Sequence, residues 1–314
     1  MSQEIRRVQV HSIHEIAKQT LKYTFNPADG RALPAFEPGA HIDVYLPNGM
    51  VRQYSLCGKT TDPFYTIAVK YEEGGRGGSV NLHTQVKIDD FLAISTPRNH
   101  FPLIHSKKKI VFIAGGIGIT PIFSMIQSLV MQNRDWELHY CARSQEHAAF
   151  YDELTQIGAN KVKTYFSEEP ILDIVSLFDS FKDDLDIYCC GPSGLMKSVE
   201  RIASNYPQQK VYFEWFVAPT NLNSQNTAFE IQLKKSNTIL LVPENKSILT
   251  VLRENSYFPI SNCEQGLCGS CETVLLEGEA DHRDCLLSEE EKKANKTIMI
   301  CISRAKSDRL VLDI

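Results

Sequence analysis

Hydrophobic and polar residues alternate over short distances in the first hundred residues. Three segments there carry β-forming residues, at Val8–Ile13, His41–Leu46 and Tyr65–Tyr71, and Pro47-Asn48-Gly49 follows the second of them as a turn. Short strands separated by turns at regular intervals are typical of an antiparallel barrel. The pattern therefore predicts an antiparallel β-barrel over residues 1–104.

From Lys109 the pattern changes. Ile110–Ala114 is a short, wholly apolar run, and after a glycine cluster a helix is expected over Pro121–Gln132, with another over Leu195–Ser204. Further buried strands are expected at Glu137–Ala142, Val162–Phe166 and Asp186–Cys190. Strands that alternate with helices predict a parallel α/β sheet, here over residues 105–218.

A third domain is expected after a linker. Residues 219–228 are polar, begin with proline and lack periodicity, which is typical of a linker. Strands follow at Phe229–Leu233 and Thr238–Val242, and a helix at Ser247–Asn255 leads into a loop rich in cysteine. The segment 229–314 is therefore expected to form an α+β domain of its own.

The composition limits the class of protein. A length of 314 residues suggests two or three domains, and a net charge of −5 makes nucleic-acid binding improbable. The sequence has no signal-like N-terminus and no apolar run of about 18 residues, so we expect a cytoplasmic protein that does not enter a membrane. Its nine cysteines are then metal ligands or reduced thiols. Five cysteines lie outside the spacing described next: Cys57, Cys141, Cys189, Cys190 and Cys285. We expect most of these to be buried and unreactive, and Cys190 is the one exception.

Four cysteines follow the C-x₄-C-x₂-C…C spacing of a plant-type [2Fe–2S] site. They are Cys263, Cys268, Cys271 and Cys301. Gly266 and Gly269 between them allow the backbone to turn its N–H groups toward the sulfurs. Four ordinary buried thiols or a zinc site are the other interpretations, but zinc usually takes two paired C-x₂-C motifs. The spacing predicts a cluster, which transfers one electron at a time.

Two glycine loops each follow an expected strand and open an expected helix. Ala114–Pro121 is the first and Tyr188–Gly194 the second. Glycine there allows a pyrophosphate to approach the backbone and the helix N-terminus, although either loop alone is equally compatible with a tight turn. Two such loops at the carboxyl edge of one parallel sheet predict a dinucleotide site.

Two further motifs lie in the expected barrel. The segment Arg52–Leu56 contains a cation, a phenol and a hydroxyl that suit binding of an electron-rich ring. The alternative interpretation is a barrel strand with one exposed arginine. Gly74–Ser79 contains four glycines before a helical segment, which makes a backbone nest for a terminal phosphate or else a flexible loop.

In this order, the motifs resemble the phthalate dioxygenase reductase family, the flavin- and iron–sulfur-containing reductases of Rieske-type oxygenases such as vanillate demethylase and carnitine monooxygenase. The resemblance is carried nearly end to end by Arg52–Leu56, Gly75–Ser79, Gly115–Pro121, Tyr188–Pro192, Phe213–Phe216, Cys263–Cys271, Asp281–Asp284 and Cys301–Ser307. It implies an FMN-binding antiparallel β-barrel at 1–104, an NAD-binding α/β domain at 105–218, the linker 219–228 and a β-grasp [2Fe–2S] ferredoxin domain at 229–314.

The resemblance also implies roles for single residues. The FMN ring and ribityl chain would contact Arg52, Gln53, Tyr54, Ser55, Ala68 and Lys70. The FMN phosphate would bind Gly77, Gly78, Ser79 and Val80. The dinucleotide would bind Gly115, Gly116, Gly118, Thr120, Cys190, Gly191 and Pro192. Phe216 would cover the flavin until nicotinamide displaces it, and the reacting centre would comprise Arg52, Ser55, Thr120, Cys190 and Glu214. Trp215 departs from the small residue expected between Glu214 and Phe216, which affects the packing over the flavin.

The implied function is electron transfer from NADH through FMN and [2Fe–2S] to a Rieske-type oxygenase, by a monomeric reductase. Two alternatives remain: a reductase that acts directly on a small-molecule acceptor, and a carrier module without catalysis. Arg143 and Ser144 follow the strand Glu137–Ala142 and either contact the adenosine ribose or are ordinary surface residues. The choice of NADH over NADPH therefore rests mainly on the resemblance, as does that of FMN over FAD. Residues 226–314 carry 14 acidic and 11 basic side chains, with much of the acid in 272–291. That acid is either a solvated face or a docking surface for the oxygenase.

Overall fold

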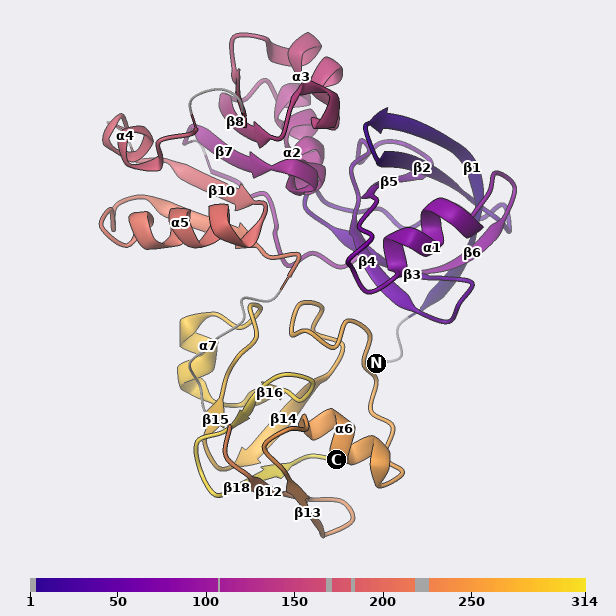
Figure 1. Cartoon of the computed structure of the whole chain (residues 1–314), viewed down its shortest axis with the longest axis vertical. Helices are drawn as coiled ribbons and strands as arrows, with labels where there is room; N and C mark the ends of the chain where they lie inside the picture. The colour runs from indigo at the N-terminus through magenta and orange to yellow at the C-terminus, as the bar shows by residue number, and fades with distance from the viewer. Residues whose placement is uncertain (1–3, 107, 168–170, 182–183, 218–225) are drawn as a thin grey trace. The chain divides into compact units, whose positions relative to one another are not determined.

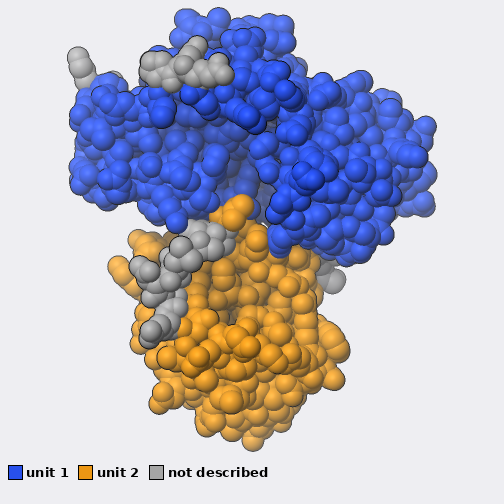
Figure 2. Space-filling view, viewed as in Figure 1, with its two compact units in different colours: residues 1–216 blue, residues 217–314 orange. Residues whose placement is uncertain are grey.

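The computed structural model describes residues 4–106, 108–167, 171–181, 184–217 and 226–314 (Figure 1). The chain divides into two compact units, residues 1–216 and 217–314, which Figure 2 distinguishes by colour. The first unit contains both a closed antiparallel sheet and a parallel sheet. The predicted linker 219–228 lies mostly outside the described residues, and the boundary predicted at 104 remains a prediction.

Six antiparallel strands form the barrel in the order β4-β3-β6-β1-β2-β5. They are β1 (Ile5–Ala17), β2 (Thr20–Pro27), β3 (His41–Tyr45), β4 (Val51–Ser55), β5 (Tyr65–Lys70) and β6 (Phe91–Ser95), with α1 (Gly78–Gln85) between β5 and β6. A bridge between Leu56 and Ile67 joins the end of β4 to β5, so the two outer strands of this order meet. The predicted antiparallel barrel is confirmed.

The barrel interior is apolar, and Asp43 is a fully buried charge at its wall. Every second residue of adjacent strands points inward, and Val8, Tyr23 and Phe25 have no exposed surface. Burying such a side chain contributes about 1.5–3 kcal/mol. Asp43 is also fully buried, and Arg98 donates two hydrogen bonds to its carboxylate, at 2.9 and 2.7 Å. This ion pair balances the charge of the buried Asp43 side chain.

Five parallel strands form the second sheet, in the order β11-β10-β7-β8-β9. They are β7 (Ile110–Gly115), β8 (Trp136–Ala142), β9 (Val162–Phe166), β10 (Asp186–Cys190) and β11 (Lys210–Glu214). The predicted parallel sheet is confirmed, but β9 was wrongly expected to be buried. It is an edge strand with half-buried side chains, because only β8 pairs with it and its outer edge has no neighbour in this sheet.

Helices cover both faces of the parallel sheet. They are α2 (Ile119–Met131), α3 (Tyr151–Gly158), α4 (Ile174–Asp179) and α5 (Ser193–Ala203), with short 3₁₀ turns at Gly116–Gly118 (η1) and Gln145–His147 (η2). α2 packs on one face, and α4 and α5 pack on the other. α2 begins two residues before the predicted Pro121, directly after the glycine loop.

The barrel and the parallel sheet share one apolar core. Cys57 and Ala68 of the barrel region are buried in the same cluster as α2 and the ends of β7 and β10. Two hydrogen bonds from α2 cross to the barrel: Ser124 Oγ donates to the Gly58 carbonyl at 3.2 Å, and Gln127 Nε2 donates to the Cys57 carbonyl at 3.0 Å. The first unit is therefore one compact body in which the two sheets share a core.

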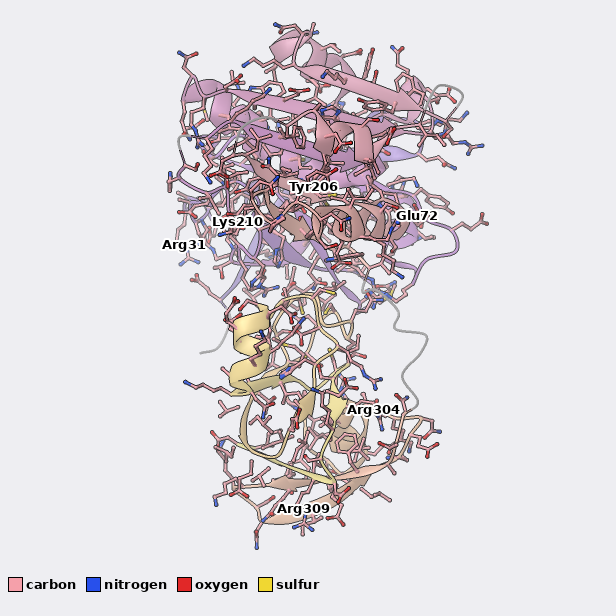
Figure 3. All side chains as sticks on the ribbon, turned by 90° about the vertical axis from the view of Figure 1, so that its left-hand side faces the viewer. Arg31, Glu72, Tyr206, Lys210, Arg304 and Arg309 are labelled. Carbon is pink, nitrogen blue, oxygen red and sulfur yellow. The ribbon has the colours of Figure 1, made fainter. Side chains whose placement is uncertain are left out.

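The second unit is a mixed five-stranded sheet in the order β13-β12-β18-β14-β16, with β12 and β18 parallel. Its elements are β12 (Phe229–Leu233), β13 (Thr238–Val242), α6 (Ile248–Glu254), β14 (Glu272–Glu277), β15 (Ala280–Asp281), α7 (Glu289–Ala294), β16 (Thr297–Met299), β17 (Arg304–Ala305) and β18 (Arg309–Leu312). α6 packs its apolar side chains against one face of the sheet, as a β-grasp domain does. The buried Arg304, labelled in Figure 3, donates to the carbonyls of Lys246, Thr227 and Pro243 and ties the start of this unit to its core.

Candidate functional site

The two glycine loops meet where the strand order of the parallel sheet reverses. The chain leaves β7 for β8 and β9 on one side, then returns to β10 on the other, so the carboxyl ends of β7 and β10 flank this switch point. The loops touch through glycines. A Cβ on Gly118 would lie 2.3 Å from the Cys190 carbonyl oxygen, and one on Gly115 would lie 2.5 Å from Pro192. Only glycine allows this approach, which leaves the start of α2 open to a ligand.

The remaining predicted dinucleotide residues lie in the same place. Gly116 has a positive φ of 52° and open space beside it, whereas the Gly191 α-carbon packs against Gly115. Thr120 is buried in the first turn of α2, and its hydroxyl donates to the Ile117 carbonyl at 2.9 Å. Thr120 thus fixes the shape of the loop from within.

Glu214 brings the barrel and the parallel sheet together at this edge. It pairs with Cys190 across β10 and β11, and its side-chain Oε2 accepts a long hydrogen bond of 3.5 Å from Ser55 Oγ, at the end of β4. Burial raises the pKa of Glu214 to about 8 and raises that of the fully buried Cys190 thiol well above its usual value. At neutral pH both groups therefore carry their protons, and the site adds no negative charge.

Residues at the end of β11 alternate between the two faces of the sheet. Phe216 packs in the cluster shared by α2 and the barrel, on the same side as Ala68. Phe213 and Trp215 pack with α5 on the opposite side, and their rings lie 6.3 Å apart. Trp215 thus belongs to a different core from Phe216, so the unexpected tryptophan does not alter the packing beside Phe216.

The predicted phosphate nest forms the N-terminus of α1. Gly77 has a φ of 75° and precedes the helix, and Gly78, Ser79 and Val80 make its first turn. Arg52 crosses this turn: a Cβ on Gly78 would lie 2.5 Å from Arg52 Cγ, and Arg52 Nη2 donates to the Arg76 carbonyl at 2.7 Å. The guanidinium therefore lies beside the nest.

Lys70 and Ser79 approach the same segment of chain. Lys70 Nζ pairs with Glu72 at 2.6 Å, and the Glu72 N–H donates to Ser79 Oγ at 3.0 Å. Tyr54 is half-buried against the barrel core, where burial raises its pKa. Gln53 points elsewhere, because its amide donates to the buried Asp43 at 2.7 Å. The Gln53 side chain therefore bonds to Asp43 in the barrel wall.

The four predicted cluster cysteines converge in the second unit. All four are buried, and their sulfurs lie within hydrogen-bonding range of one another, Cys263 with Cys268 and Cys301, and Cys271 with Cys301. Hydrogen bonds from Cys268 and Cys301 hold the pKa of Cys263 far below its usual range. Four closely packed, buried cysteines fit an iron–sulfur group, which binds four cysteine sulfurs.

The backbone around these sulfurs also fits such a group. The N–H groups of Gln265 and Leu267 donate to Cys263 Sγ at 3.3 and 3.4 Å. Gly266 and Gly269 have φ angles of 67° and 71°. A Cβ on Gly266 would also lie 2.7 Å from Ile302, so a side chain there would be both strained and crowded. The glycines predicted to wrap the cluster are at the positions that require them.

The other cysteines fit the prediction in most cases. Cys57, Cys189 and Cys190 are buried, and burial raises the pKa of Cys57 to about 12, whereas Cys141 and Cys285 keep partial exposure.

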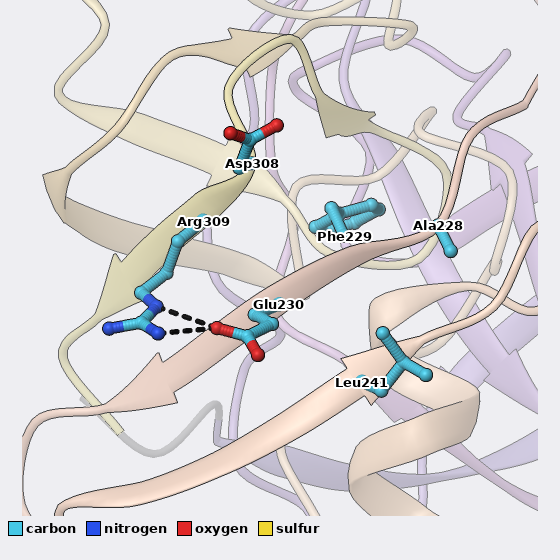
Figure 4. A pocket seen from close by; sticks show the side chains of 6 residues that line it. All are labelled: Ala228, Phe229, Glu230, Leu241, Asp308 and Arg309. Carbon is cyan, nitrogen blue, oxygen red and sulfur yellow. Dashed lines mark hydrogen bonds and ion pairs between the residues drawn. The ribbon is translucent and has the colours of Figure 1, made fainter.

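A separate hollow on the second unit is lined by no predicted site residue (Figure 4); its lining is Ala228, Phe229, Glu230, Leu241, Asp308 and Arg309. An ion pair between Arg309 and Glu230 crosses it.

Comparison with known proteins agrees with this arrangement. The model for an oxidoreductase NAD-binding domain matches residues 112–201, and that for a 2Fe-2S iron-sulfur cluster binding domain matches residues 231–306. The second range contains all four predicted cluster ligands. Together the fold and site define a class: an NAD-dependent oxidoreductase that passes electrons through a flavin to a plant-type [2Fe–2S] cluster.

The chain belongs to the phthalate dioxygenase reductase family. It is 42% identical to phthalate dioxygenase reductase of Burkholderia cepacia, covering 98% of this chain and 97% of that protein. It is 39% identical to tetrachlorobenzoquinone reductase of Sphingobium chlorophenolicum, with 97% of each covered. A solved phthalate dioxygenase reductase, described as a modular structure for electron transfer from pyridine nucleotides to [2Fe–2S], matches with a TM-score of 0.73 and 40% identity, over 99% of this chain and 98% of that one. Within the described ranges, no helix is long and apolar enough to cross a membrane.

Proposed function

We propose that the chain is the NADH-dependent reductase component of an oxygenase system, carrying electrons from NADH through FMN and the cluster to a separate oxygenase. The observation that supports this most strongly is the meeting of Ser55, Cys190 and Glu214 where the barrel reaches the switch point of the parallel sheet. A flavin accepts a hydride as an electron pair and releases single electrons, which is the conversion that a [2Fe–2S] acceptor requires.

Three parts of the first unit would hold the flavin. The α1 nest supplies backbone N–H groups to the phosphate. Arg52 lies beside that nest, so we assign it to the phosphate rather than to the reduced ring. Tyr54, Ser55 and Ala68 line the strands between the nest and Glu214, where the ring would lie.

Ser55, Cys190 and Glu214 would orient the nicotinamide. The raised pKa of Glu214 keeps a proton on its carboxyl at pH 7, so the group can donate a hydrogen bond and does not repel an electron-rich ring. The apolar surroundings, including Phe216 at the edge of the shared core, would exclude water from the transfer. The dinucleotide phosphates would lie at the start of α2, against the glycine loops.

The test of the flavin site is Arg52→Ala, with Arg31→Ala as a matched control. Arg31 is 73% exposed and pairs only with nearby Asp29 in the contacts that the structure describes. We expect Arg52→Ala to lose FMN on gel filtration while its far-ultraviolet circular dichroism stays unchanged, and Arg31→Ala to keep FMN. Normal FMN affinity in Arg52→Ala would contradict the assignment of Arg52 to the FMN phosphate.

The oxygenase partner is supported by the appended cluster and by the reductase relatives. The acid of the second unit includes Glu289, Glu290 and Glu291 in the first turn of α7, and a basic surface on the oxygenase would complement it. Strong slowing of oxygenase reduction at high salt is expected. We also propose that the reaction takes place in the cytoplasm and that the reductase is a monomer; none of its nine cysteines, all within the described residues, forms a disulfide, in keeping with a reducing compartment.

A second candidate function is direct reduction of a quinone, which the 39%-identical tetrachlorobenzoquinone reductase favours. The two functions differ in where electrons leave the chain. We expect NADH oxidation with tetrachlorobenzoquinone to persist in a cluster-free variant only if the quinone accepts from the flavin. Reduction of a purified Rieske oxygenase should require the cluster. A quinone that supports faster turnover than any oxygenase would favour the second function.

A further inference from the structure

The segment Asp281–Leu287 has no part in the proposed chemistry, yet it contacts the cysteine loop. The Asp284 side chain is fully buried, and its Oδ2 accepts from the N–H groups of Leu286 at 3.2 Å and Leu287 at 2.9 Å. A carboxylate that bonds the backbone two and three residues ahead closes a tight turn. Asp284 thus fixes the backbone of residues 284–287.

This turn lies against Gly266, between the first two predicted ligands. The Cys285 N–H donates to the Gly266 carbonyl at 3.2 Å. A Cβ on Gly266 would lie 3.1 Å from Asp284 Cα, so the two backbones are in contact. The turn and the cysteine loop are therefore held together by a hydrogen bond and by direct packing.

The Gly266 carbonyl and the Leu267 N–H belong to one peptide group. A peptide group is planar and trans, so its C=O and N–H point in opposite directions and move as one rigid unit. Its oxygen accepts from Cys285, and its N–H donates to Cys263 Sγ at 3.4 Å. Fixing the oxygen therefore fixes the direction of the N–H.

We propose that Asp284 is a positioning residue that raises the reduction potential of the cluster by aiming the Leu267 N–H at the Cys263 sulfur. The reduced cluster carries one more negative charge than the oxidised cluster, and hydrogen bonds to its sulfurs stabilise that charge. The chain of contacts runs from the Asp284 carboxylate through the Cys285 N–H and the Gly266–Leu267 peptide to the sulfur. The inference rests on the proposed [2Fe–2S] site.

The test compares Asp284→Ala with Asp284→Asn. Both variants lack the carboxylate charge, so a difference between them reflects geometry alone. Asparagine keeps an oxygen that can accept from Leu286 and Leu287, and its amide nitrogen would face His282 Nδ1, which lies 3.9 Å from Asp284 Oδ1. Alanine keeps neither contact. The full-length protein is used, and potentials come from titrations followed by EPR of the reduced cluster.

We expect the cluster in Asp284→Ala to be about tenfold harder to reduce than in Asp284→Asn, which is about 59 mV for a one-electron couple. Asp281→Ala is the matched control, because Asp281 belongs to the same segment but pairs with Arg283 instead of closing the turn. It should resemble the wild type. Equal potentials in the alanine and asparagine variants, or a higher potential in the alanine variant, would overturn the proposal.

A measurement on the wild type covers the case in which Asp284→Ala holds no cluster. With ¹⁵N-leucine incorporated, pulsed EPR of the reduced cluster should detect a coupled leucine nitrogen, since Leu267 donates to a cluster sulfur. The absence of any leucine coupling would overturn the proposal. Failure of the proposed function is distinct, because then NADH would not reduce a cluster in the wild type at all.

Discussion

Glu214→Gln replaces the half-buried carboxyl with a neutral amide of the same shape, and we expect it to remove a pH dependence from the stability of the first unit. Burial raises the pKa of Glu214 from 4.5 to about 8, against the hydrogen bond from Ser55, which lowers it. The folded chain therefore holds this proton over a pH range in which the unfolded chain has released it.

The direction and size of the effect follow from this difference. Between pH 4.5 and 8, unfolding releases the proton, so raising the pH favours unfolding by at most about 1.4 kcal/mol per pH unit. The stabilisation is complete below the unfolded pKa and is lost as the pH rises through the folded pKa. From pH 6 to pH 8 the upper bound is about 2.7 kcal/mol. Because the Glu214 side chain keeps some contact with solvent, we expect about 1–2 kcal/mol.

Urea unfolding at pH 6, 7 and 8 measures this, followed by tryptophan fluorescence. Both tryptophans, Trp136 and Trp215, belong to the first unit, so the signal reports that unit alone. The wild type should lose about 1–2 kcal/mol more between pH 6 and pH 8 than Glu214→Gln. Glu200→Gln, at an exposed position on α5, is the control and should follow the wild type. Parallel pH profiles for the wild type and Glu214→Gln would refute the reasoning.

Three further predictions concern the other parts of the molecule. Gly118→Ala should keep its flavin but lose flavin reduction by NADH in stopped-flow absorbance, because its Cβ would lie 2.3 Å from the Cys190 carbonyl oxygen. Gly194→Ala, whose Cβ would have no atom within 4 Å, should behave as the wild type. Equal rates of flavin reduction in the two variants would contradict the close contact at Gly118. Cys268→Ser should let NADH bleach the flavin but abolish the EPR signal of a reduced cluster, whereas Cys285→Ser should keep it; a normal signal in the first variant would disprove the ligand assignment. Arg98→Met should destabilise the first unit by about 3 kcal/mol in urea unfolding, because it removes the guanidinium that balances the charge of the buried Asp43. Asp43→Asn in the same chain should recover part of the loss, and no destabilisation would show that the pair is dispensable.

The parts of the site that depend on local sequence could be predicted. The glycine loops follow β7 and β10 directly, and in a parallel sheet the carboxyl ends of strands lie at one edge, so their approach follows from the strand pattern. The cysteine spacing works in the same way, because Cys263, Cys268 and Cys271 lie in one loop. Each of these predictions needs little more than the order of residues along a short segment.

The parts that depend on tertiary packing could not be predicted from the residues alone. Ser55 and Glu214 are 159 residues apart and meet only because the barrel packs on the parallel sheet. The contact of the Arg52 side chain with Gly78 also depends on the position of α1, which the residues alone do not predict. The contact between Asp284 and Gly266 likewise joins two loops that share no local pattern.

Some secondary structure was missed for identifiable reasons. β1 runs to Ala17, well beyond the predicted Ile13, because register shifts after Val10 and Glu15 break the alternation that marks a strand. α7 was not predicted, although Ser288 and Glu291 form a capping box that the sequence displays. The first difference reflects an irregular backbone, and the second a short helix that only its capping residues mark in the sequence.

The central claim is that electrons from NADH reach the four-cysteine cluster through the flavin. The most direct test mixes the wild type with NADH under anaerobic conditions and follows flavin absorbance and low-temperature EPR together after rapid freezing. The account predicts that flavin bleaching comes first and that the EPR signal of a reduced [2Fe–2S] cluster then rises as electrons leave the flavin. A cluster that stays oxidised while the flavin is fully reduced, or one that is reduced in flavin-free protein, would contradict it.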